Sequence, residues 1–455
     1  MNRSSDNRYD VIIVGAGVAG ATAAYLLAQK NFRVLLVDSK PFERAGDKPC
    51  GDAIGKHHFE ELGLRPPSGD ELDGYVRGIY LYSPSEEVVL RVEGEGFEIN
   101  RVRFTQRLIR EAVDRGVEYM GSAKVSEPVI ESGFVRGVKI LKENSKITAY
   151  ANVVIEASGN SRSILQRLPS DWPIVETLDP RDSNIAYREI RRLRRDIEDP
   201  EYIRIYVSNR IAPGGYWWDF PKSKYRNITN IGLGIQGGMG YGHPRDYLYK
   251  YVLTRELYKD SEVIEAGGAL VPTRRPLLTM TWNGIIAIGD AAFTVNPVHG
   301  GGKGSAMLAA KAAAIAISKA YETQDFSAKG LWIMNKLYHE FYGAKQASLD
   351  LFRIFLQRLS DDDIEYGLRK RIMRESDLYE TSSTGVIKRS VFDKLERVLA
   401  GLGRPSLLIK LAQVAHYMEK IRELYSRYPE RPEDLDKWKV ELMSLYEEFY
   451  RVLGK

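Results

Sequence analysis

A glycine-rich turn near the start of the chain is the first segment whose residue types and spacing could do chemistry. Gly15, Gly17 and Gly20 have the spacing Gly-x-Gly-x-x-Gly and follow an apolar run at 9–14. In such a unit the first glycine makes the tight turn, the second admits a pyrophosphate and the third allows close helix–strand packing. Asp38 ends the next apolar run, where a carboxylate can accept hydrogen bonds from ribose hydroxyls. The segment therefore predicts a dinucleotide-binding site, with the pyrophosphate at a helix N-terminus.

A second segment, at 285–303, bears on which dinucleotide is bound. An apolar strand ends in Gly289 and Asp290, and three glycines at 300–302 lead into an Ala-rich helix. Asp290 can hydrogen-bond a ribityl hydroxyl, and the start of the helix can face the carbonyl edge of a flavin ring. In this pattern the segment resembles the second FAD fingerprint of the para-hydroxybenzoate-hydroxylase-type flavoproteins, which implies FAD as the cofactor. Those flavoproteins also carry an Asp-Gly pair in mid-chain, where this sequence has Ser158 and Gly159, a degraded match.

Two further motifs indicate one family within these flavoproteins. The loop after the second strand reads Lys-Pro-Cys-Gly-Asp-Ala at 48–53, and a later stretch reads Pro-Gly-Gly-Tyr-Trp-Trp-Asp-Phe-Pro at 213–221. Together they resemble the geranylgeranyl reductase family, whose members carry a Pro-Cys-Gly loop and a Tyr-x-Trp-x-Phe-Pro stretch. The resemblance extends over roughly residues 8–330 and is stronger there than in the helical tail.

The resemblance implies an FAD-dependent oxidoreductase of isoprenoid ether-lipid biosynthesis, as in archaeal membranes. The implied reaction saturates isolated double bonds of geranylgeranyl chains, carried on a diphosphate or on a digeranylgeranyl glycerophospholipid. Hydride would come from N5 of the reduced flavin and a proton from elsewhere, with NAD(P)H or a ferredoxin as the reductant. A flavin-dependent monooxygenase or halogenase of the same superfamily is the main alternative, and a flavin-bound lipid carrier without turnover is another. Halogenases carry Trp-x-Trp-x-Ile-Pro, so Tyr216 and Phe220 favour the reductase.

The cofactor contacts that the resemblance implies come from four stretches of the chain. They are Gly15, Gly17, Ala19, Gly20, Asp38, Cys50, Gly51, Ala53, Gly159, Gly289, Asp290, Gly301, Gly302 and Lys303. Arg107 and Val125 fit two more contact positions by a looser alignment. We expect the flavin to lie where these stretches meet.

Cys50 and Tyr216 are the candidate catalytic residues, and the proton that accompanies the hydride would come from Cys50, a tyrosine or an ordered water. A cysteine between Pro49 and Gly51 lies in a loop, and this position argues against a role as a small buried core residue. Substrate contact is predicted for Tyr216, Trp217, Trp218 and Phe220. Since strand residues alternate between faces, Tyr216 and Trp218 share one face and Trp217 takes the other. A packed aromatic strand is the alternative interpretation.

The composition bounds the class of protein. The 455 residues include 66 basic and 61 acidic side chains, a net charge of +5, and a single cysteine, which excludes an intrachain disulfide. We predict no metal site, because His57, His58 and His299 form no metal-binding motif, and no nucleic-acid partner, because no dense basic stripe is present.

The Arg-rich stretch at 188–195 is either a solvated strand end or a contact for anionic lipid headgroups. We expect a cytoplasmic protein, with peripheral membrane contact left open, because the longest apolar run, at 306–317, is too short to span a bilayer.

The order of expected elements predicts an α/β fold. A discontinuous, doubly wound FAD-binding domain would comprise residues 1–74, 101–170 and 276–330. Residues 75–100 and 171–275 would form an inserted antiparallel substrate-binding sheet domain, because their apolar residues alternate. Residues 331–455 would form a helical C-terminal region, since Leu407 to Ile421 and Leu435 to Phe449 repeat apolar residues every three or four positions. These helices would either enclose the prenyl tail or pack as ordinary core.

Overall fold

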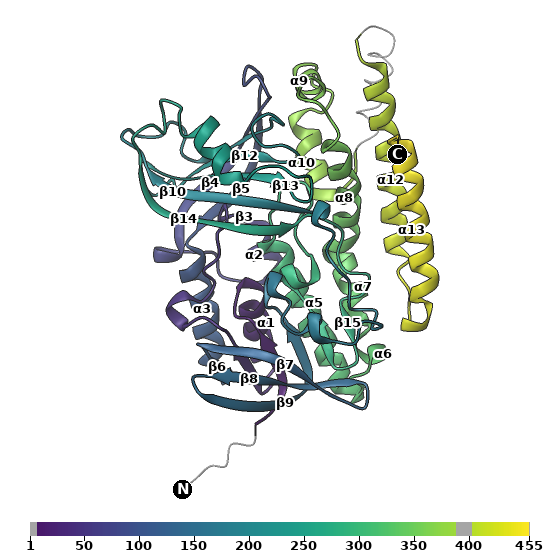
Figure 1. Ribbon diagram of the computed structural model, residues 1–455. Helices are drawn as coiled ribbons and strands as arrows, with labels where there is room; N and C mark the ends of the chain where they lie inside the picture. The colour runs from purple at the N-terminus through teal and green to yellow at the C-terminus, as the bar shows by residue number, and fades with distance from the viewer. Residues whose placement is uncertain (1–6, 388–402, 455) are drawn as a thin grey trace.

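A mostly parallel sheet forms the lower half of the molecule in the computed structural model, which describes residues 7–387 and 403–454 (Figure 1). Its strand order is β15-β16-β9-β1-β2-β6, and all neighbours are parallel except β15 and β16. The strands are β1 (Arg8–Val14), β2 (Val34–Val37), β6 (Glu118–Met120), β9 (Ser145–Glu156), β15 (Thr281–Trp282) and β16 (Ile285–Ala287). Their Val- and Ile-rich runs are buried, as expected for a parallel sheet covered by helices.

Three helices pack around this sheet, namely α1 (Val18–Ala28), α3 (Arg101–Val113) and α5 (Lys303–Thr323). Helix α1 contacts both others, and its alanine-rich sequence allows close approach to α5. A hairpin of β7 (Ala123–Glu131) and β8 (Phe134–Lys142) continues from the long strand β9. The sequence analysis predicted this half of the fold but not the hairpin.

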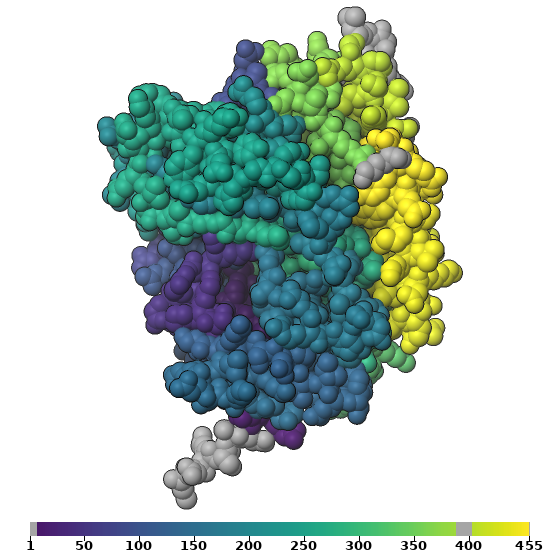
Figure 2. Space-filling view, in the orientation of Figure 1, coloured from purple at the N-terminus to yellow at the C-terminus, as the bar shows by residue number. Residues whose placement is uncertain are grey.

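A second sheet of eight strands lies above the first, with a recess between them on the face that Figure 2 shows. Its order is β14-β10-β13-β12-β11-β4-β5-β3, antiparallel except between β11 and β4. The strands are β3 (Ala53–Gly55), β4 (Leu72–Tyr82), β5 (Val89–Ile99), β10 (Ser183–Arg192), β11 (Tyr202–Tyr206), β12 (Tyr216–Pro221), β13 (Ile228–Gln236) and β14 (Glu262–Pro272). Residues 53–55, which the sequence analysis placed in the FAD-binding region, form the edge strand β3 of this sheet.

Helices cover one side of both sheets. They are α7 (Ile333–Tyr338), α8 (Ala344–Leu356), α9 (Asp361–Arg369), α10 (Glu375–Thr384), α12 (Pro405–Ser426) and α13 (Leu435–Val452). Shorter helices are α2 (His57–Leu62), α4 (Pro244–Tyr247) and α6 (Ala328–Leu331). Helix α12 packs on α8 through a core that includes Leu411, Val414 and Met418. Of the expected helical region, residues 388–402 and 455 lie outside the described part of the chain.

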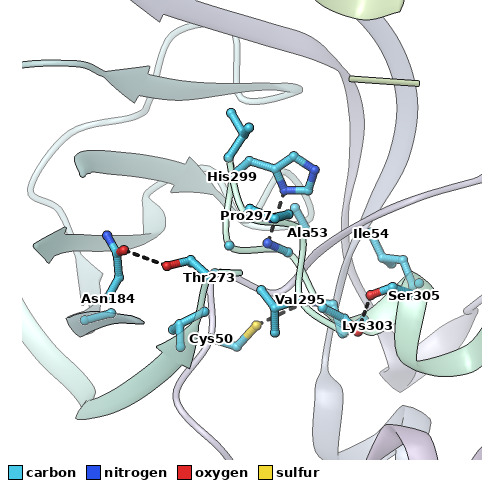
Figure 3. A pocket seen from close by; sticks show the side chains of 18 of the residues that line it. Cys50, Ala53, Ile54, Asn184, Thr273, Val295, Pro297, His299, Lys303 and Ser305 are labelled. Carbon is cyan, nitrogen blue, oxygen red and sulfur yellow. Dashed lines mark hydrogen bonds between the residues drawn. The ribbon is translucent and has the colours of Figure 1, made fainter. Parts of the chain in front are cut away.

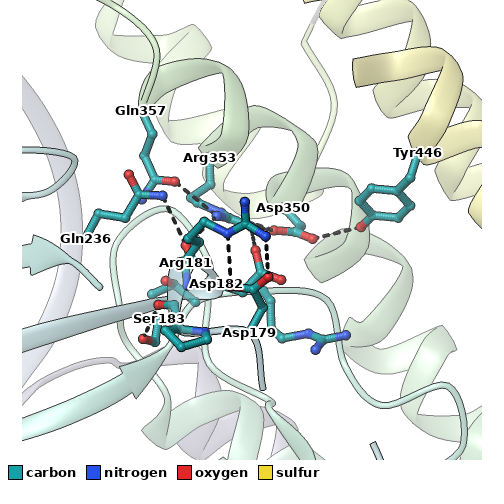
Figure 4. A network of polar contacts seen from close by, with 12 residues as sticks. Asp179, Arg181, Asp182, Ser183, Gln236, Asp350, Arg353, Gln357 and Tyr446 are labelled. Atoms are coloured by element: carbon teal, nitrogen blue, oxygen red, sulfur yellow. Dashed lines mark hydrogen bonds and ion pairs between the residues drawn. The ribbon is translucent and has the colours of Figure 1, made fainter. Parts of the chain in front are cut away.

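A polar network fixes α8 and α13 to the second sheet (Figure 4). Arg353 of α8 forms ion pairs with Asp350, at 2.5 Å, and with Asp182, at 3.0 Å, beside the start of β10. Tyr446 of α13 donates a hydrogen bond to Asp350 at 2.8 Å. Because the guanidinium and Asp350 are both buried, this network holds the helices at a set position against the sheet. Within residues 7–387 and 403–454, no helix is long and apolar enough to cross a membrane.

Candidate active site

One continuous cavity of about 1300 Å³ lies between the two sheets and the C-terminal helices. Its polar end is lined by Gly15, Gly17, Ala19, Asp38, Lys48, Arg101, Val125, Gly159, Gly289, Asp290, Gly301, Gly302 and Lys303. Its apolar end is lined by Phe352, Leu356, Ile364, Leu368, Ile372, Leu407 and Leu411. Cys50, Gly51, Ala53, Tyr216, Trp218 and Phe220 lie on the wall of the same cavity. The structure thus brings together stretches that are far apart in the sequence.

The glycine-rich turn forms the base of the polar end. Gly15 has φ +102°, a left-handed conformation that favours glycine, and a Cβ there would lie 2.5 Å from the carbonyl oxygen of Ala157. A Cβ on Gly17 would meet no atom within 4 Å, so open space lies beside the start of α1. No side chain caps that helix, which leaves its first N–H groups for an anion. Gly20 does not line the cavity, because it faces the Gly15 carbonyl, where a Cβ would overlap.

Carboxylates flank this turn. Asp38 accepts hydrogen bonds from the backbone N–H of Ala16, at 2.6 Å, and of Lys40, at 2.7 Å, which fixes the carboxylate at the end of β2. Asp290, after β16, forms an ion pair with Lys48. Burial opposes ionisation of Asp290, but Lys48 and then Arg101 outweigh it and keep the pKa of this carboxyl below its ordinary value.

The polar end fits FAD on two structural observations. A Cβ on Gly17 would meet no atom within 4 Å, so the backbone at the start of α1 is open to the cavity, as approach of a pyrophosphate requires. Arg101 lines the cavity, and its Nε is buried without a hydrogen-bond partner among the described residues, so a further acceptor is needed there. The sequence analysis missed Arg101 and named Arg107 instead.

Arg107 does not line the cavity. Its guanidinium pairs with Glu71 at 2.9 Å and with Glu111, on the same helix α3, at 3.3 Å. It also donates a hydrogen bond to the carbonyl of Arg65. Residues six apart on a helix do not share a face, which is why Arg101 lines the cavity and Arg107 does not. Arg101 could have been recognised as the first residue of the helix that follows a strand of the second sheet.

Cys50 lies where the polar end meets the second sheet, with its sulfur directed toward Lys303 (Figure 3). The Lys303 Nζ is 3.3 Å from the Sγ atom, and the backbone N–H of Asp52 is 3.5 Å from it. Burial would raise the pKa of the thiol, but the charges of Lys303 and Arg101 outweigh burial and Asp52, so the pKa lies below its ordinary value. The cysteine is therefore a stronger acid than a free thiol.

The Pro-Cys-Gly loop and strand β12 hold each other in place through Asn230 of β13. Asn230 donates a hydrogen bond to the carbonyl of Cys50 at 2.7 Å and accepts one from the indole N–H of Trp218 at 3.1 Å. Gly51 lies against Phe220, since a Cβ there would be 2.9 Å from the ring. The two sequence motifs are therefore one structural unit, and Asn230, which the sequence analysis missed, joins them.

The two faces of β12 have different surroundings. Tyr216 donates its hydroxyl to the carbonyl of His299 at 2.7 Å, and burial raises the pKa of this phenol. Trp217 does not line the cavity. Its ring is 1% exposed, stacks on Tyr206 at 3.5 Å and lies under the guanidinium of Arg255 at 4.6 Å. The alternation of strand residues places Trp217 in the core behind the sheet, so substrate contact has no geometric support at this position.

The remaining polar candidates have local partners. His57, His58 and His299 line the cavity, and burial lowers the pKa of His57 and of His299 to about 4. Among the described residues, no group of three His, Cys, Asp or Glu side chains could hold a metal ion. In the Arg-rich stretch, Arg188 pairs with Glu265 at 2.5 Å and Arg191 pairs with Glu189. Much of that charge is thus compensated within the sheet.

Comparisons with known proteins agree with this geometry. Residues 182–271 match the model of a geranylgeranyl reductase catalytic domain, and residues 13–45 match an NAD(P)-binding Rossmann-like domain. The chain is 53% identical over 98% of its length to a digeranylgeranylglycerophospholipid reductase of Sulfolobus acidocaldarius, covering 99% of that protein.

Two solved structures share the fold. A geranylgeranyl bacteriochlorophyll reductase-like protein from Thermoplasma acidophilum superposes with a TM-score of 0.76 at 24% identity, over 90% of this chain and 99% of that one. The myxobacterial chondrochloren halogenase, an FAD-dependent halogenase, gives 0.65 at 19% identity, over 92% and 97% of the two chains. The predicted fold class is confirmed, and the halogenase shares the fold at lower identity.

Proposed function

We propose, from the premise that this chain belongs to the digeranylgeranylglycerophospholipid reductase family, that it saturates the geranylgeranyl chains of an archaeal-type ether phospholipid. The protein is an FAD-dependent oxidoreductase of isoprenoid lipids, as the sequence motifs predicted. The observation that carries the proposal is that one cavity joins the polar end to the apolar end, with Cys50 at the junction. A reductase of long isoprenoid chains needs both environments within reach of one reacting atom.

The polar end would hold the cofactor. The N–H groups at the start of α1 would bind the pyrophosphate, Asp38 the ribose, and Asp290 with Lys48 the ribityl chain. Bound FAD, once reduced, supplies a hydride to one alkene carbon. The protein binds and orients the two partners and keeps water from the reacting carbon.

The apolar end would hold the prenyl chain. Its lining comes from α8, α9 and α12, and each methylene group buried there stabilises the complex by about 0.8 kcal/mol. The sequence left open whether these helices enclose the substrate or only pack as core. Because their side chains line a cavity continuous with the cofactor end, we favour enclosure of the substrate.

Cys50 is the better candidate for the proton that accompanies the hydride. The pKa of its thiol is lowered by Lys303 and Arg101, whereas burial raises the pKa of Tyr216 and its hydroxyl already donates to His299. A thiol with a lowered pKa releases a proton more readily than a phenol with a raised one. Tyr216 would instead fix the loop that precedes α5.

The reductant and the site of action complete the proposal. NAD(P)H or a ferredoxin would reduce the flavin, and the enzyme would work in the cytoplasm at a membrane surface, where its lipid substrate resides. Sedimentation with anionic and with neutral vesicles tests the membrane contact. If the enzyme bound neither the anionic nor the neutral vesicles, the proposed membrane contact would be contradicted.

Anaerobic turnover tests the function itself. The holoenzyme, reduced with dithionite, would receive digeranylgeranyl glycerophospholipid or geranylgeranyl diphosphate, and the products would be weighed by mass spectrometry. We expect saturated phospholipid, heavier by two hydrogen atoms for each reduced bond. Lipid that changes only when oxygen is admitted, with gain of an oxygen or halogen atom, would contradict the proposal.

A further inference from the structure

A lysine without an acidic partner lies on the wall of the cavity. Lys345, in the first turn of α8, lines the cavity, and its ammonium group forms no hydrogen bond or ion pair with any described residue. The Nζ atom lies 4.8 Å from the centre of the Tyr342 ring. Because a charge removed from water without a partner is costly, an ammonium in this position is a candidate binding group for an anion.

The face of α8 that carries Lys345 continues into the apolar end of the cavity. Phe352 and Leu356 follow Lys345 by seven and eleven residues, close to two and three helical turns, so the three side chains share one face. All three line the cavity. At about 1.5 Å of rise per residue, Leu356 lies about 16 Å along the helix from Lys345. One wall of the cavity therefore offers a cation at one end and apolar side chains at the other.

His299 supplies a second hydrogen-bond donor on this side of the cavity. Its Nδ1 accepts a hydrogen bond from the backbone N–H of Gly301 at 3.1 Å, so the ring proton is on Nε2 (Figure 3). Nε2 forms no hydrogen bond with a described residue. Asn296 joins the two groups, because its amide donates to the Tyr342 hydroxyl at 2.9 Å and its Oδ1 accepts from the backbone N–H of His299 at 3.2 Å. Lys345 and His299 thus lie at two ends of one hydrogen-bonded unit.

The charges around Lys345 leave it positive and uncompensated. Burial lowers its pKa to about 8, Glu61 of α2 opposes this effect, and Arg422 of α12 adds to it. Glu61 forms no ion pair with Lys345, and its carboxylate lies 3.7 Å from Nδ1 of His58. The ammonium is therefore still charged at pH 7, in surroundings that do not stabilise the charge.

We propose that Lys345 and His299 bind the phosphate group of the prenyl substrate, whose chain then runs along α8 toward the apolar end. The inference rests on the proposed function, because that function supplies a phosphate-bearing isoprenoid lipid. Hydrogen bonds from an ammonium to a phosphate are among the strong ones, and they would give Lys345 its missing partner. Since Tyr216 donates to the carbonyl of His299 at 2.7 Å, the phosphate site adjoins the junction where Cys50 lies. A phosphate held there would fix which double bond lies beside Cys50 in each binding event.

Calorimetric titration of the oxidised holoenzyme tests the site without turnover. The probes are geranylgeranyl diphosphate and geranylgeraniol, which has the same chain and no phosphate. We expect Lys345→Met to weaken binding of the diphosphate about 10- to 100-fold and to leave binding of the alcohol unchanged. Lys345→Arg should restore part of the loss, and Lys439→Met, an exposed control on α13, should bind both probes as the wild type does. Unchanged diphosphate binding in Lys345→Met, or an equal loss for the two probes, would overturn the inference.

His299→Asn tests the second donor. The Asn side chain can still accept the hydrogen bond from Gly301 but lacks the Nε2 donor, and we expect a several-fold weaker binding of the diphosphate. Diphosphate binding equal to that of the wild type would remove His299 from the site.

FAD content and Tm separate this role from a structural one. Lys345→Met should keep its FAD and gain Tm at pH 7, because the charge that it removes has no partner in the fold. A higher Tm together with weaker diphosphate binding is the pattern of a binding group. A loss of FAD would assign the lysine to the cofactor and overturn the inference, as would a fall of Tm that accounts for the weaker binding.

Turnover distinguishes the two sources of the phosphate. We expect Lys345→Met to raise KM about tenfold or more for digeranylgeranyl glycerophospholipid and for geranylgeranyl diphosphate, with a smaller change of kcat. A rise for the diphosphate alone would assign the site to the free diphosphate, and an unchanged KM for both would overturn the inference. Weaker diphosphate binding in an enzyme that saturates no lipid would refute the proposed function and leave the phosphate site standing.

Discussion

The two ends of the cavity are built by different means. The polar end is made of backbone turns and charged side chains, several of them fixed by a hydrogen bond or an ion pair such as Lys48–Asp290. The apolar end is made of side chains such as Leu411 on helices, and these side chains meet one another by packing alone, although a polar network holds α8 against the second sheet. Directional contacts set the position of a cofactor to a fraction of an ångström, whereas packing sets the shape of a channel through which a chain can slide. The difference fits one fixed reactant and one that presents several double bonds in turn.

Removal of the thiol at the junction should have the largest effect. Cys50→Ala takes away the proposed proton donor and leaves the other predicted cofactor contacts in place. We expect turnover to fall by about 10²–10⁴-fold, with the visible flavin spectrum retained. Stopped-flow reoxidation by the phospholipid measures the rate. Turnover close to that of the wild type would exclude a chemical role for Cys50.

Filling the polar end should weaken cofactor binding without unfolding the protein. Gly17→Val places its methyl groups in the open space beside α1, so the loss arises from crowding of the bound pyrophosphate, about 1–3 kcal/mol or roughly 5- to 150-fold in FAD affinity. Flavin content and Tm are the measurements. As a matched contrast, Gly20→Ala should lower Tm as well, because its Cβ would overlap the carbonyl of Gly15.

Filling the apolar end should change the preference for substrate chain length and leave cofactor binding unchanged. Leu411→Trp narrows the channel, and we expect kcat/KM for a geranylgeranyl substrate to fall about tenfold while a geranyl substrate is little affected. Val440→Trp, on the exposed face of α13, is the control. Equal losses for both chain lengths would argue that these helices only form core.

The two tryptophans of β12 separate the cavity face from the core face. Trp218→Phe removes the buried hydrogen bond to Asn230, and we expect a stability loss on the order of 1 kcal/mol together with a several-fold fall of turnover per bound flavin. Trp217→Phe weakens the stack on Tyr206, and we expect about 1–2 kcal/mol of stability to be lost with turnover per bound flavin unchanged. The opposite pattern would reverse the assignment of the faces.

An effect on stability and its pH dependence should come from Lys345, a cation on the cavity wall of α8. Burial lowers its pKa to about 8 from an ordinary 10.5. Between these values the unfolded chain binds more protons, so this group destabilises the fold fully below about pH 8 and less as pH rises toward 10.5. Lys345→Met should raise Tm at pH 7 and change it little at pH 10.5. A lower Tm of the variant at pH 7 would contradict this sign.

The sequence predicted the polar end better than the rest of the site, for a physical reason. The glycine turn and Asp38 act through backbone geometry within 30 residues, which a spacing records directly. Asn230, which joins the Cys50 loop to Trp218, depends on strand register that no local pattern reveals.

One anaerobic single turnover tests most directly whether the cavity is the active site of an alkene reductase. The holoenzyme, reduced by one electron pair per flavin, is mixed with digeranylgeranyl glycerophospholipid while the flavin spectrum is recorded and the lipid is weighed. We predict that the oxidised flavin spectrum returns without oxygen, with one double bond saturated for each flavin reoxidised. A flavin that stays reduced beside unchanged lipid, and reoxidises only in air, would contradict the claim that the two ends of the cavity form one active site for alkene reduction.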